Sequence, residues 1–306
     1  MNNEIIYKLL KLFIILLGLL PRRVAKFCSD ILGLLWFKID KRHRKIALDN
    51  ISLAYTSEFS SKQVLALGKK VFKNTIHMIF DIAWAFRKSQ KELLTYYTIK
   101  GYDNLKGALQ KDRGVLLLSG HIGNFELLVA AFGHDPDFKM YGAYRKLDFF
   151  PLERLMLEER QRFGTTMIPL QGAAKKIDAI LKNKDVVATL LDQNANWHSG
   201  VNVDFFGRPA CTNKGFAALA LRTRSLVVPM CIAKTKDTFV VEFLPEIPLE
   251  STGDMIRDLE ANTQNYAAAI ESMVRKYPDQ YFWVHNRWKT KPYSIITEKK
   301  LKSSPK

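Results

Sequence analysis

The chain has 306 residues and a hydrophobic content of 47%, which is enough for one large domain with a sizeable core. Its formal net charge of +17 indicates an anionic partner, for which nucleic acid, an anionic bilayer and an acidic carrier protein all qualify. The three cysteines, Cys28, Cys211 and Cys231, are widely spaced and form no Cys-x-x-Cys pair, so neither a zinc site nor a disulfide framework is indicated.

The N-terminal stretch from Ile5 to Leu20 is strongly apolar and carries only two charges, Lys8 and Lys11. Its uninterrupted apolar part is too short to cross ~30 Å of hydrocarbon by itself. With both lysine side chains extended to the interface, the stretch could form a short or tilted span. A Pro-Arg-Arg sequence follows at 21–23, where a signal peptide would have small residues, so we expect a retained anchor.

A second segment, Val24 to Phe37, interleaves apolar and charged residues and suits an interfacial helix. The basic residues after the anchor are Arg22, Arg23, Lys26, Lys38, Lys41, Arg42, Arg44 and Lys45. By the positive-inside tendency, they keep the main domain cytoplasmic. We therefore expect membrane helices over 1–38, a main domain over 39–290 and a basic, disordered tail over 291–306. A pair of ordinary core helices at the N-terminus is the alternative.

From residue 60 onward the pattern becomes that of a folded domain. Ser60 and Gln63 form a capping box that predicts a helix to about residue 88. Short apolar runs then alternate with helical stretches. The predicted strands are 97–100, 115–118, 139–144, 166–168, 186–191, 226–232 and 239–243, and the predicted helices are 104–110, 125–132, 149–163, 173–182, 214–222 and 254–276. This alternation predicts an α/β fold with a mixed central sheet flanked by helices.

The second predicted strand ends at a Ser-Gly pair, and His121 and Glu126 lie between it and the next helix, for which Asn124 is the expected cap. Five residues of a regular helix correspond to about 500° of rotation, so the two side chains would diverge by about 140°. They converge only if the turn is not helical, which Gly120 and Gly123 allow. A histidine held by a carboxylate at the end of a strand is what a general base requires.

This His-x-x-x-x-Glu pattern resembles the motif of the glycerolipid and lysophospholipid acyltransferase superfamily. The phrase Gly-His-Ile-Gly-Asn-Phe-Glu at 120–126 is closer to one branch, the late acyltransferases of lipid A biosynthesis. Further segments that resemble this branch are 144–148, 192–194, 203–210, 226–229 and 280–289. The resemblance implies a glycerolipid acyltransferase-like fold in which His121 and Glu126 are the catalytic residues.

Three more residues are candidates for binding substrate at the carboxyl ends of strands. Arg145 follows the third predicted strand, where the resemblance implies contact with a phosphorylated acceptor; a solvated surface arginine is the alternative. Asp192 follows the fifth predicted strand and could order the polar network of the site. Arg208 could contact an anion, while Phe205 and Phe206 either line an acyl path or belong to the core.

The resemblance implies an O-acyltransferase of the bacterial inner membrane. Such an enzyme moves a fatty acyl chain from an acyl carrier protein thioester to a hydroxyl of a lipid A precursor. The acyl thioester is the co-substrate, and no cofactor or metal is indicated. A basic surface fits both an acidic carrier protein and anionic membrane lipid. Nucleic acid is disfavoured, because the sequence has no helix-turn-helix or similar motif.

Two other functions stay open at this point. The first keeps the same chemistry but uses a lysophospholipid, glycolipid or aminolipid as acceptor, with acyl carrier protein or acyl-CoA as donor. The second is a non-catalytic basic module that binds membrane. A catalytically inactive relative would be expected to lose the His121 and Glu126 pair, and this chain has both.

Overall fold

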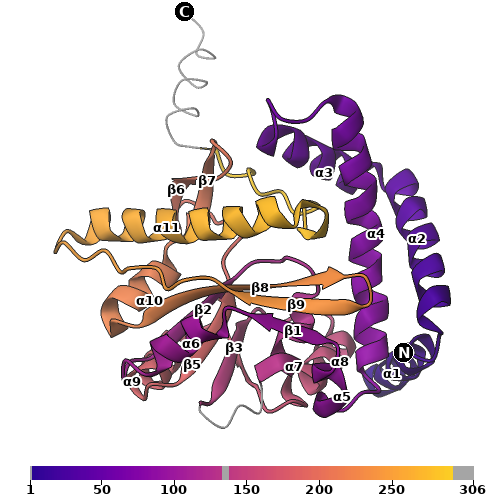
Figure 1. Ribbon diagram of the computed structural model, residues 1–306, viewed down its shortest axis with the longest axis horizontal. Coiled ribbons are helices and arrows are strands. Elements are labelled where there is room, and N and C mark those ends of the chain that lie inside the picture. Colours follow the sequence, from indigo (N-terminus) through magenta and orange to yellow (C-terminus); the bar gives the residue numbers. More distant parts are fainter. Residues whose placement is uncertain (1, 133–137, 292–306) are drawn as a thin grey trace, which may run out of the picture.

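The computed structural model describes residues 2–132 and 138–291 (Figure 1). The basic tail predicted over 291–306 lies outside the described residues, apart from its first residue. The strands are β1 (Tyr97–Lys100), β2 (Val115–Ser119), β3 (Met140–Tyr144), β4 (Thr166–Pro169), β5 (Val186–Leu190), β6 (Gly200–Asp204), β7 (Pro209–Asn213), β8 (Leu226–Thr235) and β9 (Thr238–Phe243).

Among the residues described, five helices precede β1, and helices then alternate with the strands from β1 to β5. The helices are α1 (Asn3–Leu17), α2 (Arg22–Ile39), α3 (Lys41–Ala54), α4 (Ser61–Ala85), α5 (Gln90–Leu94), α6 (Tyr102–Leu109), α7 (Leu128–Phe132), α8 (Phe150–Gln161), α9 (Ala174–Lys182), α10 (Gly215–Thr223) and α11 (Met255–Lys276). Short 3-10 turns occur at Phe125–Leu127 and Pro278–Gln280. The capping box predicted at Ser60 is present and begins α4.

Seven strands form the central sheet in the order β1-β9-β8-β2-β5-β3-β4, and β6 and β7 form a separate hairpin. β2 pairs in parallel with both β5 and β8, whereas β8 and β9 are antiparallel, so the sheet is mixed as predicted. All seven predicted strands occur in it. β2 is buried along its whole length, which explains why its sequence is apolar up to its last residue, Ser119.

Successive residues of β2 point to opposite faces of the sheet and join different cores. Leu116 and Leu118 pack in a cluster with residues of α4, α9, α10 and α11. Val115 and Leu117 pack in a second cluster with residues of α6 and α7. Helices therefore cover both faces, as expected, and the edge formed by the strands' carboxyl ends is left for the polar residues that follow them.

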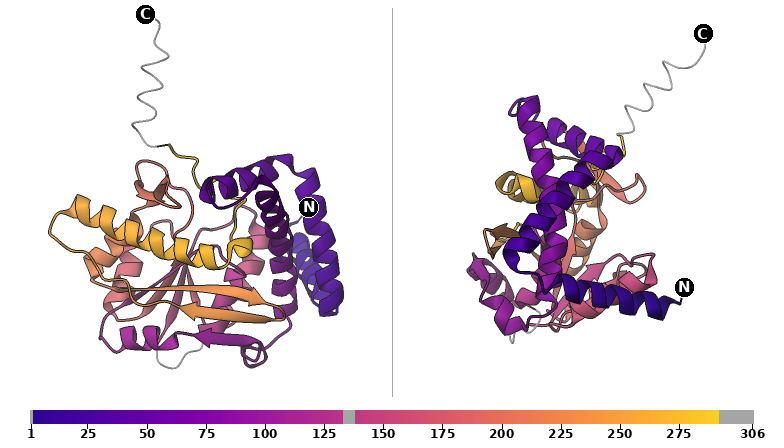
Figure 2. Two further views of the ribbon diagram at one scale, coloured as in Figure 1. Left: turned by 45° about the horizontal axis from the view of Figure 1, so that its top comes forward. Right: turned by 90° about the vertical axis from the view of Figure 1, so that its right-hand side faces the viewer.

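The N-terminal helices pack on the sheet domain. α2 lies along α4, and α1 reaches α8 (Figure 1, Figure 2). The Tyr7 hydroxyl of α1 donates to Glu158 of α8 at 2.6 Å, and Arg154 of α8 pairs with Glu4 of α1 at 2.6 Å. Within the described ranges, no helix has both the length and the apolar character needed to cross a membrane.

Some local features differ from expectation. The helix expected over 125–132 begins as a 3-10 turn at Phe125. Asn124 does not cap it, because its amide donates instead to the Met78 carbonyl of α4 at 3.1 Å. α3 and the β6–β7 hairpin were not predicted. The hairpin turn places Phe206 and Gly207 in the left-handed region (φ 57° and 70°), and phenylalanine is rare there, so the usual turn signal is missing.

Candidate active site

The carboxyl ends of β2 and β5 lie side by side and bring His121 and Asp192 together. Ser119 of β2 is in register with Leu190 of β5, and the Leu191 N–H donates to the Ser119 carbonyl at 3.0 Å. Nδ1 of His121 lies 2.7 Å from Oδ1 of Asp192. Both side chains are largely enclosed, with exposed fractions of 18% and 3%. The two residues form a histidine–carboxylate dyad at the edge where ligands of such sheets gather.

The turn that carries His121 is fixed by a glycine and by the C-terminal segment. Gly123 has a φ of 58°, and a Cβ there would lie 2.1 Å from the Ile232 carbonyl oxygen. Its N–H donates to the Gln280 carbonyl at 2.8 Å, and the Phe282 N–H donates to the His121 carbonyl at 3.0 Å. The turn is not α-helical, as expected, and backbone contacts at His121 and at Gly123 hold it in place.

Burial and charge act in opposite directions on the dyad. Burial alone would lower the pKa of His121 and raise that of Asp192, because it disfavours the charged form of each. Their mutual attraction and hydrogen bond outweigh burial, so the pKa of His121 is raised and that of Asp192 is lowered. With Nδ1 bound to the carboxylate, Nε2 remains for proton transfer, and it lies 3.3 Å from the Gln193 amide.

Residues of the C-terminal segment enclose Asp192. Tyr281 is buried beside it, and burial together with the carboxylate charge raises the pKa of Tyr281 well above its usual value. Nε2 of His285 accepts the Asn194 N–H at 2.9 Å, and burial lowers the pKa of His285, which fits a structural role. Arg287 is buried and donates to a β7 carbonyl at 3.0 Å. The carboxylate of the dyad is thereby kept away from bulk water.

Glu126 has Arg160 of α8 as its partner, and in the described part of the chain no hydrogen bond joins it to His121. Nε and Nη2 of Arg160 donate to the two Glu126 oxygens at 2.7 and 2.6 Å. Glu126 still acts on His121 at a distance, because its charge adds to the raised pKa. The direct contact expected from Glu126 is thus made by Asp192. Arg160 was not predicted, since α8 has several Glu and Arg residues that the sequence does not distinguish.

The other residues suggested by the resemblance lie apart from the dyad. Arg145 follows β3 with its side chain 86% exposed, and its nearest carboxylate is 4.0 Å away. Nε of Arg208 donates to the Leu53 carbonyl of α3 at 3.0 Å, so this guanidinium holds the end of a helix. Phe205 and Phe206 are buried in the core, which supports the simpler of their two interpretations.

Two cavities meet at Phe125, beside the dyad. The first, which we call the polar cavity, has a volume of about 260 Å³, lies between α2, α4 and the β8–β9 turn, and includes His121 in its wall. The second, the apolar cavity, measures about 90 Å³ and lies over the ends of β2, β5 and β3. Glu126 and Arg160 are the charged residues of its lining among those the structure describes.

Comparisons with known proteins identify the family of the chain. The sequence model of the family described as bacterial lipid A biosynthesis acyltransferase matches residues 3–290. The chain is 25% identical over 266 residues to the lipid A biosynthesis lauroyltransferase of Escherichia coli (strain K12), covering 86% of this chain and 85% of that protein. It is 24% identical over 281 residues to the lipid A biosynthesis palmitoleoyltransferase of the same strain, covering 89% and 87%.

A more distant similarity involves another lipid acceptor. The chain is 26% identical over 193 residues to the phosphatidylinositol mannoside acyltransferase of Mycolicibacterium smegmatis, covering 61% of this chain and 60% of that protein. The family match spans nearly the whole chain, including both halves of the dyad. The protein therefore belongs to the bacterial lipid A biosynthesis acyltransferase family, in its late-acyltransferase branch, and is an O-acyltransferase.

Proposed function

We propose that the protein transfers a fatty acyl chain from an acyl carrier protein thioester to a hydroxyl group of a lipid A precursor, with His121 as the general base. The observation that carries the proposal is the 2.7 Å contact between Nδ1 of His121 and Asp192. It leaves Nε2 for proton transfer in a residue that lines the polar cavity. The names of the two Escherichia coli relatives, both lipid A biosynthesis acyltransferases, support the acceptor.

The chemistry needs no covalent acyl-enzyme, because a thioester is already activated. Nε2 of His121 takes the proton of the acceptor hydroxyl while its oxygen attacks the thioester carbonyl carbon. A C–O bond forms, and the carbonyl electron pair moves to oxygen to give a tetrahedral oxyanion. When the oxyanion collapses, the C–S bond breaks and the leaving thiolate takes the proton from His121. The products are an ester and a free thiol. The raised pKa of His121 favours the imidazolium formed in between.

Asp192 and Glu126 have different parts in this mechanism. Asp192 keeps the proton of the neutral imidazole on Nδ1 and stabilises the imidazolium. Glu126 acts through its charge and by holding Arg160 with two hydrogen bonds. Both members of that ion pair line the apolar cavity, so Glu126 is a positioning residue for the guanidinium at the place where the acyl group would enter.

The apolar cavity supports a place for the acyl chain. Its apolar lining includes Leu128, Val129, Met140, Met167, Leu190 and Met230. Its volume of about 90 Å³ is well below the range of about 300–1,000 Å³ typical of ligand sites. A whole fatty chain therefore requires neighbouring side chains to move, and methionines are the most adaptable residues for this. The acyl chain would thus pack against β3 and β5 while its thioester lies near His121.

The N-terminal helices support a position at the membrane surface. Large apolar side chains that their outward faces expose are Ile5, Leu9, Leu12, Phe13, Leu16, Phe27, Ile31, Leu32, Leu35 and Ile39. Soluble monomers rarely expose so many together, and helices of this kind lie in the bilayer interface. The basic residues that follow α1 favour the cytoplasmic face of the bacterial inner membrane, with anionic lipid and the acidic carrier protein as partners.

The proposed function is tested by mass spectrometry of lipids after incubation with acyl carrier protein thioesters. The acceptors are a tetra-acylated lipid A precursor and, separately, a lysophospholipid, with the His121→Ala protein as control. We expect an acyl mass on the lipid A precursor only, and only with the unmodified protein. Transfer to the lysophospholipid alone would keep the mechanism and refute the acceptor.

A glycolipid is the second candidate acceptor, and the similarity to a phosphatidylinositol mannoside acyltransferase favours it. The same assay with a mannosylated phosphatidylinositol in place of the lipid A precursor distinguishes the two. Replacing the carrier protein thioester with acyl-CoA tests the donor independently. Activity with acyl-CoA and none with the carrier protein would overturn the proposed donor while leaving the acceptor assignment intact.

A further inference from the structure

We infer that the polar cavity holds the phosphorylated sugar head group of the acceptor, with Arg22 and Lys234 as its phosphate-binding residues. The inference rests on the proposed function, because it says where the acceptor of that reaction is bound. It moves anion recognition from Arg145 and Arg208, which lie apart from the dyad, to a cavity that His121 itself lines.

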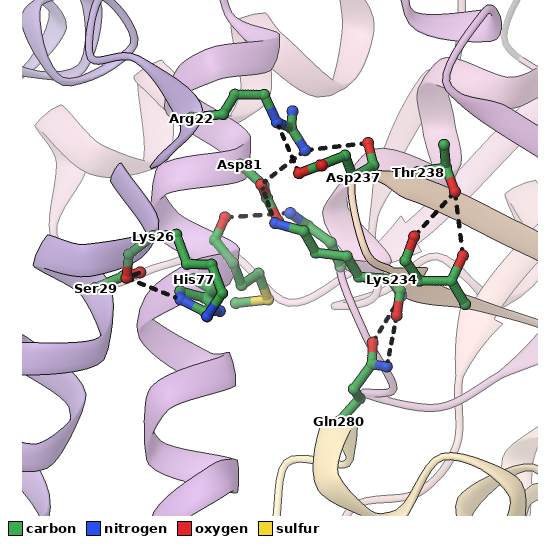
Figure 3. Close-up of polar contacts among 12 residues, drawn as sticks. Arg22, Lys26, Ser29, His77, Asp81, Lys234, Asp237, Thr238 and Gln280 are labelled. Atoms are coloured by element: carbon green, nitrogen blue, oxygen red, sulfur yellow. Dashed lines mark hydrogen bonds and ion pairs between the residues drawn. The ribbon is translucent and has the colours of Figure 1, made fainter. Parts of the chain in front are cut away.

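Residues from five separate parts of the chain line this cavity, and Figure 3 shows polar contacts among several of them. Nζ of Lys234 lies 2.7 Å from both oxygens of Asp81 on α4. An ammonium has three donors, so one is left after these two contacts. Nη2 of Arg22, at the start of α2, donates to the Asp237 carbonyl at 3.2 Å and lies 4.0 Å from Asp81. The two cations thus meet around one carboxylate and keep donors for a ligand.

Two polar atoms of the lining have no partner among the described residues. Nη1 of Arg22 is a buried donor, and Oδ1 of Asn124 is a buried acceptor. Asn124 is 3% exposed and lies three residues after His121. Buried polar groups are nearly always hydrogen-bonded, so these two call for a ligand with both acceptors and donors. Phosphate oxygens satisfy Arg22, and a sugar hydroxyl satisfies Asn124.

The local charge favours an anion. Arg22 and Lys234 share the single Asp81 carboxylate, at 4.0 and 2.7 Å. The Asp237 carboxylate is 82% exposed and 3.7 Å from Nε of Arg22, so its hold on that guanidinium is weak. Arg22 lies over the Trp84 ring at 4.4 Å, which fixes its plane. The first turn of α2 has no side-chain cap and borders the cavity, and helix N-termini attract negative charge.

The two cavities differ in polarity, which indicates where each substrate binds. The polar cavity, at about 260 Å³, is just below the range of about 300–1,000 Å³ typical of ligand sites. It accommodates a head group and leaves the lipid chains of the acceptor outside, toward the exposed faces of α1 and α2. The apolar cavity on the other side of Phe125 takes the donor chain, so His121 lies where head group and thioester meet.

The test compares a phosphorylated lipid A precursor with its dephosphorylated counterpart, measured as the ratio of their kcat/KM values. The variants are Arg22→Gln and the double variant Lys234→Gln/Asp81→Asn, in which neither charge is left unpaired. Lys70→Gln is the control, because Lys70 is an exposed lysine of α4 that lines neither cavity. Arg22→Gln alone decides the question if the double variant does not fold.

We expect the unmodified protein to prefer the phosphorylated acceptor by at least about tenfold, the factor that one hydrogen bond to a charged group supplies. Arg22→Gln and the double variant should each reduce this ratio by about tenfold. Lys70→Gln should leave it unchanged. A ratio in Arg22→Gln equal to that of the unmodified protein would overturn the inference.

A binding measurement separates this inference from the proposed function. If no acyl chain is transferred to either acceptor, the proposed function fails, but the cavity can still be probed in the His121→Ala protein. We expect saturation-transfer NMR to show glucosamine 1-phosphate bound, with a weaker signal after Arg22→Gln. An equal signal from glucosamine without phosphate, or no change after Arg22→Gln, would refute the phosphate site.

Discussion

Nδ1 of His121 and Oδ1 of Asp192 lie 2.7 Å apart, although 71 positions separate them in the chain. The parallel pairing of β2 with β5 brings them together, because each residue stands just after the end of its strand. The relationship matters for chemistry, since a carboxylate on Nδ1 leaves Nε2 as the proton acceptor. The two residues have different roles in the dyad, so mutating each one should have a different effect on activity.

We predict that His121→Ala abolishes acyl transfer and that Asp192→Asn lowers kcat by about 10²–10⁴-fold, because an amide no longer holds the imidazole in the required tautomer. Steady-state assays with the lipid A precursor measure both effects. Circular dichroism of each variant controls for folding. Retention of full activity in folded His121→Ala would falsify the general-base assignment.

The raised pKa of His121 has a consequence for pH dependence. The base must be neutral to accept a proton, so activity should rise with pH through the pKa of His121 and then level off. Without the Asp192 charge the pKa falls, and the acidic limb of the Asp192→Asn profile should move to lower pH. Profiles of kcat/KM against pH for the unmodified protein and for Asp192→Asn locate the acidic limb of each. A limb that stays in place would mean that another group titrates.

The Glu126–Arg160 ion pair should contribute to stability as well as to the site. Both side chains are largely enclosed, so Glu126→Gln leaves a poorly paired guanidinium and should lower the free energy of unfolding by about 2–3 kcal/mol. The double variant Glu126→Gln/Arg160→Met should recover most of this loss, because it removes the unpaired charge. Urea unfolding measures both values.

An exposed ion pair is the matched control for that experiment. Lys184 and Asp112 lie 2.6 Å apart at the surface, and Lys184→Met should change the free energy of unfolding by no more than about 0.5 kcal/mol. If Glu126→Gln and Lys184→Met lowered the free energy of unfolding equally, burial would not be what makes the Glu126–Arg160 pair stabilising.

Gly123 is predicted to be intolerant of any side chain. Its φ of 58° disfavours other residues by about 1–2 kcal/mol, and the Cβ of Gly123→Ala would also collide with the Ile232 carbonyl. We expect lower thermal stability and loss of activity, since the same turn carries His121. Gly107→Ala is the control: it lies in α6 with open space around it, and alanine there should stabilise by about 0.5–1 kcal/mol.

The exposed face of α1 is predicted to bind membranes. The double variant Phe13→Glu/Leu16→Glu removes two exposed apolar side chains and leaves the core unchanged. Burying each of these side chains in the bilayer would contribute about 1.5–3 kcal/mol to membrane binding. Flotation with vesicles of phosphatidylethanolamine and phosphatidylglycerol should therefore fall by more than about tenfold. Ile256→Glu, at an exposed apolar position of α11, should leave flotation unchanged. An equal loss in all variants would argue against a specific face.

Much of the fold was predictable because burial gives β2, β5 and β8 mostly apolar runs. His121 was predictable for a related reason, since a strand, a breaker pair and a helix define its turn. Its partner was not, because strand order decides which two carboxyl ends are neighbours, and no local pattern encodes that order. Arg208 was misleading because α3, which supplies its carbonyl partner, has mixed apolar and charged positions that gave no clear periodicity.

The backbone contacts of Gln280 and Phe282 with the turn at 121–123 also bear on biosynthesis. On the ribosome, β2, β5 and both dyad residues emerge long before the segment that fixes the turn. A nascent chain therefore has the histidine and the aspartate but not the backbone geometry that aims them. We therefore expect acyl transfer only from chains that include residues 280–282 and have folded them against the turn.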